Sequence, residues 1–418
     1  MNNGQYAALV GIDWAHQKHD ICLQEAGSDK LEYSVLEHSP EAIDAWARGL
    51  RERFGGRPVA MGLELTRGPL VSALQKYDFI ALYPINPTSL ARYRNTWFVS
   101  GAKDDPSDAA LALDMMKTHP ERFTVLKPQS AEMRALQQLV EARRCLVDDR
   151  TRITNRIIDA LKGYHPHVLK WFDDRSTALF GDFLERWPTL EAVQKVRRDV
   201  LERFFRQHNV RGQTRIDGRI DAIKSAMTLT DDPGVVIPNQ LLVRSLVAQL
   251  HPLRQSIAEY DVEIKRLCES HRDFAIFDSF PGAADVFAPR LLAAWGEDRS
   301  RFGSASEMQR YSGTAPVIRK SGQSKVVRWR FACPTFMRQS FVEWAGQTIP
   351  TSYWAGAYYR QQMARGKSRQ TALRALAFKW QRIMYQCWQQ RKPYDEVHYL
   401  QALQKSGSPL LQNAITAP

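Results

Sequence analysis

The chain has 418 residues, of which 44% are hydrophobic and 25% charged, a composition that fits two or three globular domains and excludes a peptide or a lone binding module. No segment approaches the roughly 20 apolar residues that a membrane span requires, and the first residues lack the basic and apolar regions of a secretory signal. We therefore expect a cytoplasmic protein. Its five cysteines are scattered and form no C-x-x-C pair, which argues against a disulfide framework or a zinc site.

The excess of basic residues is concentrated in one segment. Lysine and arginine number 58 against 45 acidic residues, and 299–392 holds 18 basic residues but only two acidic ones, Glu307 and Glu343. Aromatic residues are interleaved with these cations, a mixture that can neutralise phosphates and stack on bases. The alternative is a solvated basic face over an aromatic core. The charge imbalance favours a polyanionic partner.

In chain order, the first part of the sequence predicts a mixed sheet. Short apolar segments separated by turn residues are typical of strands. Five such segments lie at 6–12, 19–24, 31–36, 59–64 and 79–83. Ser39-Pro40 is typical of a helix start, and we expect helices near 40–54 and 69–77. Three strands, a helix, a strand, a helix and a strand is the order of an RNase H-like fold.

The middle of the chain predicts two long helices around a helical insert. Apolar residues lie at helical spacing over 131–161. From Val243 to Leu267 they alternate spacings of three and four residues, as in a coiled coil. The insert spans about 170–235. An antiparallel partner within the chain or a second subunit could bury the coiled-coil seam, and the sequence leaves this choice open.

The C-terminal part is expected to be mainly helical. Phe280-Pro281-Gly282 forms a turn between two helical stretches. This suggests a helix-hairpin-helix, which can present backbone N–H groups to a phosphate, although an ordinary helical hairpin fits equally well. We place the domain boundaries at 1–125, 126–272 and 273–395, followed by a tail at 396–418.

Four carboxylates stand where they could form a metal site. Asp13 ends the first predicted strand and Glu64 the fourth, and these strands are neighbours in an RNase H-like sheet. Asp105 and Asp108 are three residues apart at the start of a helix and so share a face. Four oxygen donors suit Mg²⁺ or Mn²⁺. The alternative for the last pair is helix capping, because Pro106 at the first helical position makes Asp105 a good N-cap.

These motifs together resemble the DEDD transposases of insertion sequence family one hundred and ten, a group that includes the pilin-gene DNA invertases. The resemblance covers about residues 6–390. The motifs that carry it are Gly11-Ile12-Asp13-Trp14-Ala15, the strand ending at Glu64, Lys103 to Ala109, Asn155-Arg156, Phe280-Pro281-Gly282, Tyr311 to Pro316 and Lys320-Ser321-Gly322.

The resemblance implies a RuvC-like N-terminal domain, a coiled-coil connection and a C-terminal transposase domain that supplies a nucleophilic serine. It also implies recombination of donor and target DNA guided by a structured RNA, by a homo-oligomer such as a dimer or tetramer. Position by position, Asp13, Glu64, Asp105 and Asp108 are the metal-binding acids, and Ser321 is the nucleophile. The family usually has a small polar residue where this chain has Asp104, and the Asp-Pro-x-Asp spacing selects Asp105.

The residues around Ser321 are compatible with this role. We expect a glycine-containing loop in which Arg319, Lys320 and Lys325 hold the scissile phosphate. Arg328 and Arg330 extend this basic, nucleic-acid-binding run. Competing serines occur at positions 312 and 324. Two rival functions remain: a junction-resolving nuclease that uses water as the nucleophile, and a non-catalytic nucleic-acid-binding protein.

Overall fold

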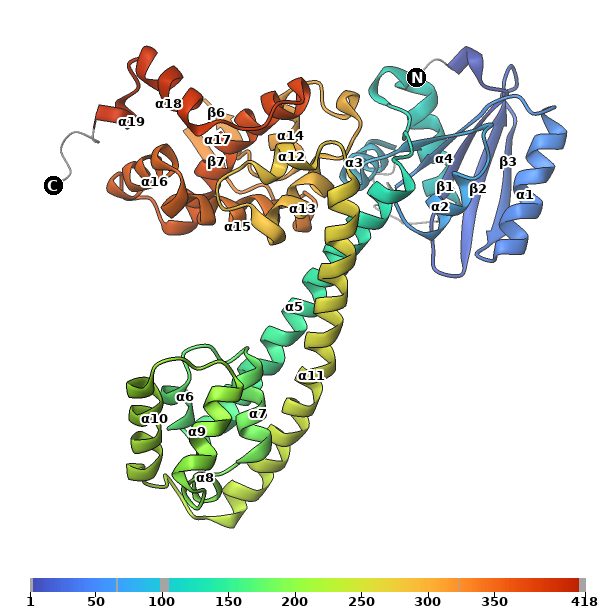
Figure 1. Cartoon of the computed structure of the whole chain (residues 1–418). Helices are drawn as coiled ribbons and strands as arrows, with labels where there is room; N and C mark the ends of the chain where they lie inside the picture. The colour runs from blue at the N-terminus through green and yellow to red at the C-terminus, as the bar shows by residue number, and fades with distance from the viewer. Residues whose placement is uncertain (1–2, 65–66, 98–104, 323, 413–418) are drawn as a thin grey trace. The chain divides into compact units, whose positions relative to one another are not determined.

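The computed structural model describes residues 3–64, 67–97, 105–322 and 324–412 (Figure 1). The chain divides into two compact units, unit 1 (residues 1–128) and unit 2 (residues 129–418). None of the helices in the described ranges is long and apolar enough to cross a membrane.

Unit 1 contains a mixed five-stranded sheet with the strand order β3-β2-β1-β4-β5. The strands are β1 (Ala8–Asp13), β2 (Lys18–Glu25), β3 (Leu31–Glu37), β4 (Val59–Leu63) and β5 (Ile80–Pro84). β1 pairs antiparallel with β2 and parallel with β4, and β4 pairs parallel with β5. This topology confirms the RNase H-like fold.

Helices cover both faces of this sheet. They are α1 (Pro40–Arg53), α2 (Pro69–Leu74), α3 (Pro87–Trp97) and α4 (Asp105–Thr118). α1 begins as predicted, because the Ser39 hydroxyl accepts a hydrogen bond from the backbone N–H of Ala42. α1 and α2 pack with Val10 and Ile12 on one face of the sheet, whereas α3 and α4 contribute to the apolar clusters on the other face. The sequence analysis did not anticipate α3.

Unit 2 is organised around two long antiparallel helices, α5 (Ala131–Tyr164) and α11 (Pro233–Ser270), which lie side by side in Figure 1. At one end Met133 packs in the same apolar cluster as Ile264, and at the other end Ile157 packs with Val243. The coiled-coil seam is therefore buried within the chain. Because α5 already covers this seam, the seam is not available for pairing with a second subunit.

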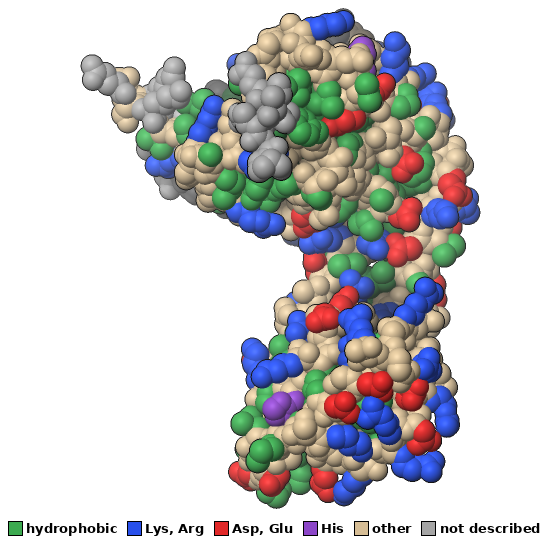
Figure 2. Space-filling model, turned by 60° about the vertical axis from the view of Figure 1, so that its left-hand side comes forward, with side chains coloured by type: hydrophobic (Ala, Val, Ile, Leu, Met, Phe, Trp, Pro, Cys, Tyr) green, Lys and Arg blue, Asp and Glu red, His purple; other side chains and the backbone are tan. Residues whose placement is uncertain are grey.

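The helical insert packs around the end of this helix pair where α5 ends and α11 begins. Its helices are α6 (Val168–Trp171), α7 (Ala178–Arg186), α8 (Leu190–Gln194), α9 (Arg198–Gln207) and α10 (Gln213–Ser225). They share one apolar core with the two long helices, with Phe180, Phe183 and Phe205 fully buried. Figure 2 shows basic and acidic side chains interspersed over this lobe, so the face in view is not a uniformly basic surface.

The other end of the helix pair carries the C-terminal part, which is mostly helical as predicted. Its helices are α12 (Phe274–Asp278), α13 (Ala284–Trp295), α14 (Ala305–Tyr311), α15 (Thr335–Thr351), α16 (Tyr353–Ala364), α17 (Arg369–Gln390), α18 (Glu396–Lys405) and α19 (Pro409–Gln412). A two-stranded hairpin of β6 (Val317–Ser321) and β7 (Ser324–Arg328) lies between α14 and α15. The sequence analysis did not predict these two strands.

Most aromatic residues of the basic segment form the core of this part. Trp344, Trp354 and Trp380 are fully buried in one cluster. Phe331 and Tyr353 are instead exposed, with 81% and 41% of their surface accessible. The core interpretation therefore holds for the buried tryptophans, and exposed rings such as these two are candidates for stacking on bases.

The Phe280-Pro281-Gly282 turn connects α12 to α13 and packs against α15. The Trp344 indole N–H donates to the carbonyl oxygen of Pro281 over 3.1 Å. Gly282 has a φ of 66°, and a Cβ there would lie 2.8 Å from the Gln347 carbonyl oxygen. The glycine is therefore required both by its backbone conformation and by the close approach of α15.

Candidate active site

Two of the predicted acids lie at neighbouring strand ends. In the parallel pairing of β1 with β4, Ile12 is opposite Leu63. Asp13 is the last residue of β1 and Glu64 directly follows β4, and each is half-buried. Because parallel strands present their carboxyl ends at the same edge of the sheet, the fold brings these acids to one edge, as the sequence predicted.

A close contact between α4 and β1 places the helix that carries the third acid against this strand. A Cβ on Gly11 would lie 1.9 Å from the Ala109 carbonyl oxygen and 2.8 Å from the Leu113 backbone nitrogen. Only glycine lets the helix backbone lie directly on the strand here. Asp108 precedes the contact residue Ala109, and Asp13 is two residues beyond Gly11. The contact therefore fixes Asp108 near the carboxyl end of β1.

Asp108 is almost fully buried, with 3% of its surface exposed, and it forms an ion pair with Arg94 of α3. The Arg94 Nε donates to Asp108 Oδ1 over 2.7 Å, and the Arg94 Nη2 donates to the other carboxylate oxygen. This two-point contact offsets the buried negative charge. Arg94 was missed by the sequence analysis, because only the tertiary fold brings α3 beside α4.

Of Asp104 and Asp105, the two remaining positions of the predicted acid motif, the structure describes only the backbone of Asp105. Asp105 is the first residue of α4, so the helix begins at the residue expected to cap it, and its side chain lies outside the described part of the structure. Asp104 lies outside the described residues. The choice of Asp105 over Asp104 thus stays a prediction.

Two histidines support the chain beyond β1. His19 is fully buried, and its Nε2 lies 2.9 Å from His38 Nδ1. The Trp14 ring stacks on His19 with centroids 6.4 Å apart. Burial, assisted by the neighbouring His38, lowers the pKa of His19 to about 4, so the ring is neutral at neutral pH. A neutral, packed imidazole indicates a structural role in orienting the segment that follows Asp13.

The predicted nucleophile lies at the tip of the β6–β7 hairpin. Ser321 is the last residue of β6, is exposed and pairs with Ser324 of β7. Gly322 follows with a φ of 54°, a conformation that favours glycine in a two-residue hairpin turn. The expectation of a loop was therefore wrong for Ser321 itself, because the alternating residues of 317–321 and 324–328 pair as strands.

Burial separates the competing serines. Ser312 is fully buried, and its hydroxyl accepts a hydrogen bond from the Gln381 side-chain amide over 2.8 Å. A hydroxyl enclosed in this way cannot reach a DNA phosphate. Ser321 and Ser324 are both exposed at the hairpin tip, so the structure leaves these two as candidates.

Side chains at the base of the hairpin fasten it to the rest of unit 2. The Arg330 Nε donates to the Ala315 carbonyl oxygen over 3.2 Å, so this predicted nucleic-acid contact is at least partly structural. The Trp329 ring has the guanidinium carbons of Arg374 and Arg338 at 3.4 and 5.1 Å from its centroid. Such cation–π contacts hold the ring against α15 and α17.

Of the other predicted nucleic-acid-binding cations, the structure describes the side chain of only one. Arg328 is exposed at the end of β7. The side chains of Arg319, Lys320 and Lys325 lie outside the described part of the structure, although their backbones belong to the hairpin. Unit 1 thus places Asp13 and Glu64 at neighbouring strand ends and pairs Asp108 with Arg94, while unit 2 carries Ser321.

Two family models match parts of the chain in both units. A family model described as Transposase, the DEDD type of IS110, matches residues 10–166, and one described as Transposase IS116/IS110/IS902 family matches residues 275–360. The chain belongs to the IS110 family of transposases. The first match contains all four predicted acids of this IS110-family transposase, and the second contains Ser321.

Two relatives from Streptomyces coelicolor extend the likeness over most of the chain. A mini-circle protein assigned as the transposase for IS117 is 27% identical over 97% of this chain and 98% of its own length. The 43.6 kDa protein of the insertion element IS110 is 28% identical over 88% of this chain and 91% of its own length. The chain is thus similar to these relatives across both of its units, including the insert.

Proposed function

We propose that this IS110-family transposase is a site-specific DNA recombinase in which Ser321 attacks a DNA phosphate held at the acids of unit 1. The observation that supports the proposal most strongly is that Asp13 and Glu64 end neighbouring parallel strands, with Asp108 on the helix that packs directly against β1 at Gly11. The three carboxylates are not within 4.8 Å of one another among the described residues, so the proposal requires their side chains to come together when a cation and a phosphate bind. Acids at neighbouring strand ends have the composition of a phosphoryl-transfer site.

The donor atoms at this edge fit a hard divalent cation. Asp13, Glu64, Asp105 and Asp108 offer carboxylate oxygens, the ligands that Mg²⁺ and Mn²⁺ prefer. A bound Mg²⁺ would offset negative charge on the scissile phosphate. Arg94 forms an ion pair with Asp108, so we infer that Arg94 fixes the orientation of this buried acid.

The serine step conserves atoms and charge. The Ser321 hydroxyl oxygen forms a bond to phosphorus, the bond from phosphorus to one deoxyribose oxygen breaks, and a proton passes from the serine to the departing oxygen by way of a base. A second DNA hydroxyl then attacks the phosphoserine and releases the enzyme, which exchanges strands without hydrolysis. Arg319, Lys320 and Lys325 are the cations that we expect at the phosphate.

A structured guide RNA and DNA are the proposed partners. Exposed cations occur near the turn between α16 and α17, namely Arg360, Arg365, Lys367 and Arg369. Within the described ranges none of these four forms an ion pair, so their charge is available for phosphates. We further propose a dimer or tetramer, so that the serine of one subunit can serve the acids of another.

Sequencing the nucleic acid that copurifies with the protein tests the RNA proposal. We expect one structured RNA species, retained at moderate salt and reduced in a variant with Arg365→Gln and Arg369→Gln. Removing two phosphate contacts should lower the slope of log affinity against log salt by about 1.4 to 1.8 units. Bulk cellular RNA without an enriched species would contradict guidance by a specific RNA.

Replacing one acid tests the metal site. Glu64→Gln keeps the shape of the side chain but removes its charge, so we expect Mg²⁺-dependent strand cleavage to fall by at least about 10³-fold. Glu41→Gln, on the exposed first turn of α1, is the matched control and should cleave normally. Equal cleavage by the two variants would contradict the proposed site.

A further inference from the structure

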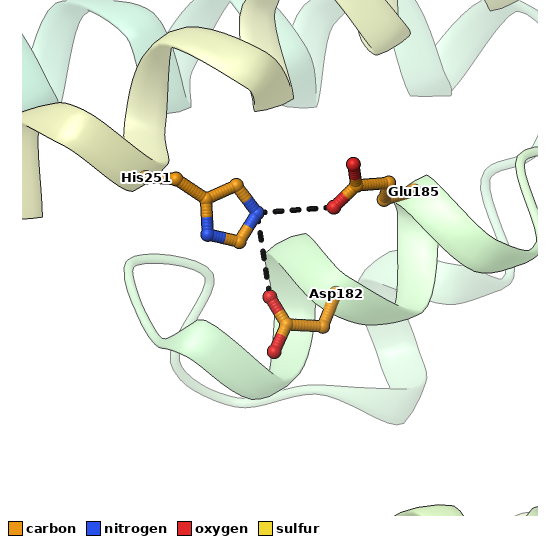
Figure 3. A group of neighbouring side chains, drawn as sticks. All are labelled: Asp182, Glu185 and His251. Carbon is orange, nitrogen blue, oxygen red and sulfur yellow. Dashed lines mark hydrogen bonds and ion pairs between the residues drawn. The ribbon is translucent and has the colours of Figure 1, made fainter.

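A second group of possible metal ligands lies in unit 2, between the two segments that the family models match. Asp182 and Glu185 are three residues apart on α7 and so share one face of that helix. His251 projects from α11 toward both of them (Figure 3). The group therefore joins the helical insert to one of the two long helices.

The three side chains direct one ligand atom each at a common point. His251 Nε2 lies 3.1 Å from Glu185 Oε2 and 3.4 Å from Asp182 Oδ1, and the three atoms are all within 4.8 Å of one another. Asp182 Oδ1 is buried, accepts no hydrogen bond from the described residues, and forms an ion pair with His251 only if that imidazole is protonated. With a neutral imidazole, the buried carboxylate oxygen faces a nitrogen lone pair, an arrangement that a bound cation would stabilise.

The surroundings orient Asp182 through its other carboxylate oxygen. His208 lies with its Nε2 at 2.8 Å from Asp182 Oδ2, the other carboxylate oxygen, and its Nδ1 at 2.9 Å from the Phe204 carbonyl oxygen. The nearby guanidinium of Arg254 donates instead to the carbonyl oxygens of residues 176 and 177. Carboxylates that bind metal ions are usually hydrogen-bonded to neighbouring groups, as Asp182 is to His208.

We propose that Asp182, Glu185 and His251 bind a divalent transition-metal ion of the zinc type, which ties the insert to α11. One imidazole nitrogen and two carboxylate oxygens form a common zinc ligand set, with bonds of about 2.0–2.2 Å. The nitrogen donor favours zinc over magnesium and so distinguishes this site from the acids of unit 1. Glu185 is largely exposed, so its side chain can move to shorten the ligand separations.

The ligand types explain why the sequence did not reveal this site. The sequence analysis argued against zinc from the spacing of the cysteines, and none of these ligands is a cysteine. His251 is 66 residues from Glu185, so no local motif connects them. Only the packing of α7 against α11 places them together.

Calorimetric titration of the full-length, tag-free protein with zinc chloride tests the proposal. The parent protein carries Asp13→Asn and Glu64→Gln, so that the acids of unit 1 do not contribute. We expect one high-affinity equivalent of zinc, and a more than about 100-fold loss of affinity in His251→Gln and in Glu185→Gln. His208→Gln, which removes only the orienting contact, should lose about 10–100-fold.

Glu191→Gln is the matched control, because Glu191 is an exposed acid of the same insert that forms an ion pair with Lys195. It should bind zinc as the parent does. Zinc should raise the Tm of the parent and of this control but not that of His251→Gln. Cobalt should give ligand-field bands without a thiolate charge-transfer band.

Two results would overturn the proposal. One is unchanged zinc affinity in both His251→Gln and Glu185→Gln, and the other is no zinc binding by the parent. Glu185 is exposed, so its variant should fold even if the His251 variant does not, as circular dichroism can verify. Neither result bears on the proposed site of unit 1, because Asp13 and Glu64 of that site are replaced in the parent.

Discussion

Ser321→Ala should abolish DNA strand cleavage and exchange, a loss of about 10⁴-fold or more, because it removes the proposed nucleophile. Ser324→Ala should retain activity within a few-fold. The two serines pair directly across the β6–β7 hairpin, and both are exposed at its tip. The same substitution at paired positions separates loss of a nucleophile from damage to the hairpin. The measurement is the rate of strand cleavage with the cognate nucleic acids and Mg²⁺.

The pattern of loss distinguishes the rival mechanisms. Retained cleavage in Ser321→Ala would show that water attacks the phosphate, as in a junction-resolving nuclease. Loss in Ser324→Ala with retention in Ser321→Ala would move the nucleophile to the other strand of the hairpin. Equal losses in both variants would indicate that the hairpin acts only through its shape.

Gly11→Ala should disrupt unit 1 and with it the metal site. The new Cβ would lie 1.9 Å from the Ala109 carbonyl oxygen, a backbone atom that cannot move away without shifting α4. We expect the free energy of unfolding to fall by about 3 kcal/mol or more, at or beyond the upper end for overpacked cores. Displacing α4 would also move Asp108, so Mg²⁺-dependent cleavage should be lost.

Gly49→Ala is the matched control for this substitution. Gly49 lies inside α1, and a Cβ there would meet no atom within 4 Å. Alanine is favoured over glycine in a helix, so this variant should be more stable by about 0.5–1 kcal/mol. Denaturant unfolding of the full chain, with hydrogen exchange in β1 and α4, measures both variants. A Gly11 variant as stable as the native protein would contradict the close contact.

Local signals made the sheet of unit 1 predictable from the sequence. Each of the five strands is a short apolar segment bounded by turn residues, and Ser39 caps α1 as its position before Pro40 indicates. The order of these elements then predicts that β1 and β4 are neighbours, which places Asp13 beside Glu64. Strands and helices that carry a clear local pattern of apolar, turn and capping residues could therefore be located from the sequence alone.

Contacts between distant segments could not be predicted in the same way. Arg94 pairs with Asp108 only because α3 packs beside α4, and α3 itself has a weak apolar pattern. The β6–β7 strands are short and largely exposed, so no buried alternation marks them. The repeat in the sequence of α11 marked its apolar seam. It did not show whether α5 or a second subunit covers that seam, because this depends on contacts between segments that are distant in the sequence.

The composition of the basic segment suggested more exposed aromatic rings than the structure has. The interleaving of cations and aromatic rings suggested stacking on bases, yet Trp344, Trp354 and Trp380 fill the core. Phe331, just beyond the end of β7, and Tyr353 are exposed exceptions. The residue types of a segment define which interactions it could make with a nucleic acid, whereas burial determines which of its side chains are accessible to make them.

Peptide mapping of the covalent DNA–protein adduct tests the serine mechanism most directly. The protein is incubated with its cognate DNA and Mg²⁺, digested with protease and nuclease, and analysed by mass spectrometry. A phosphodeoxynucleotide attached to Ser321 is the expected result, present in the native protein and in Ser324→Ala but absent in Glu64→Gln. Cleaved DNA with free ends and no adduct, or an adduct on another residue, would contradict attack by Ser321.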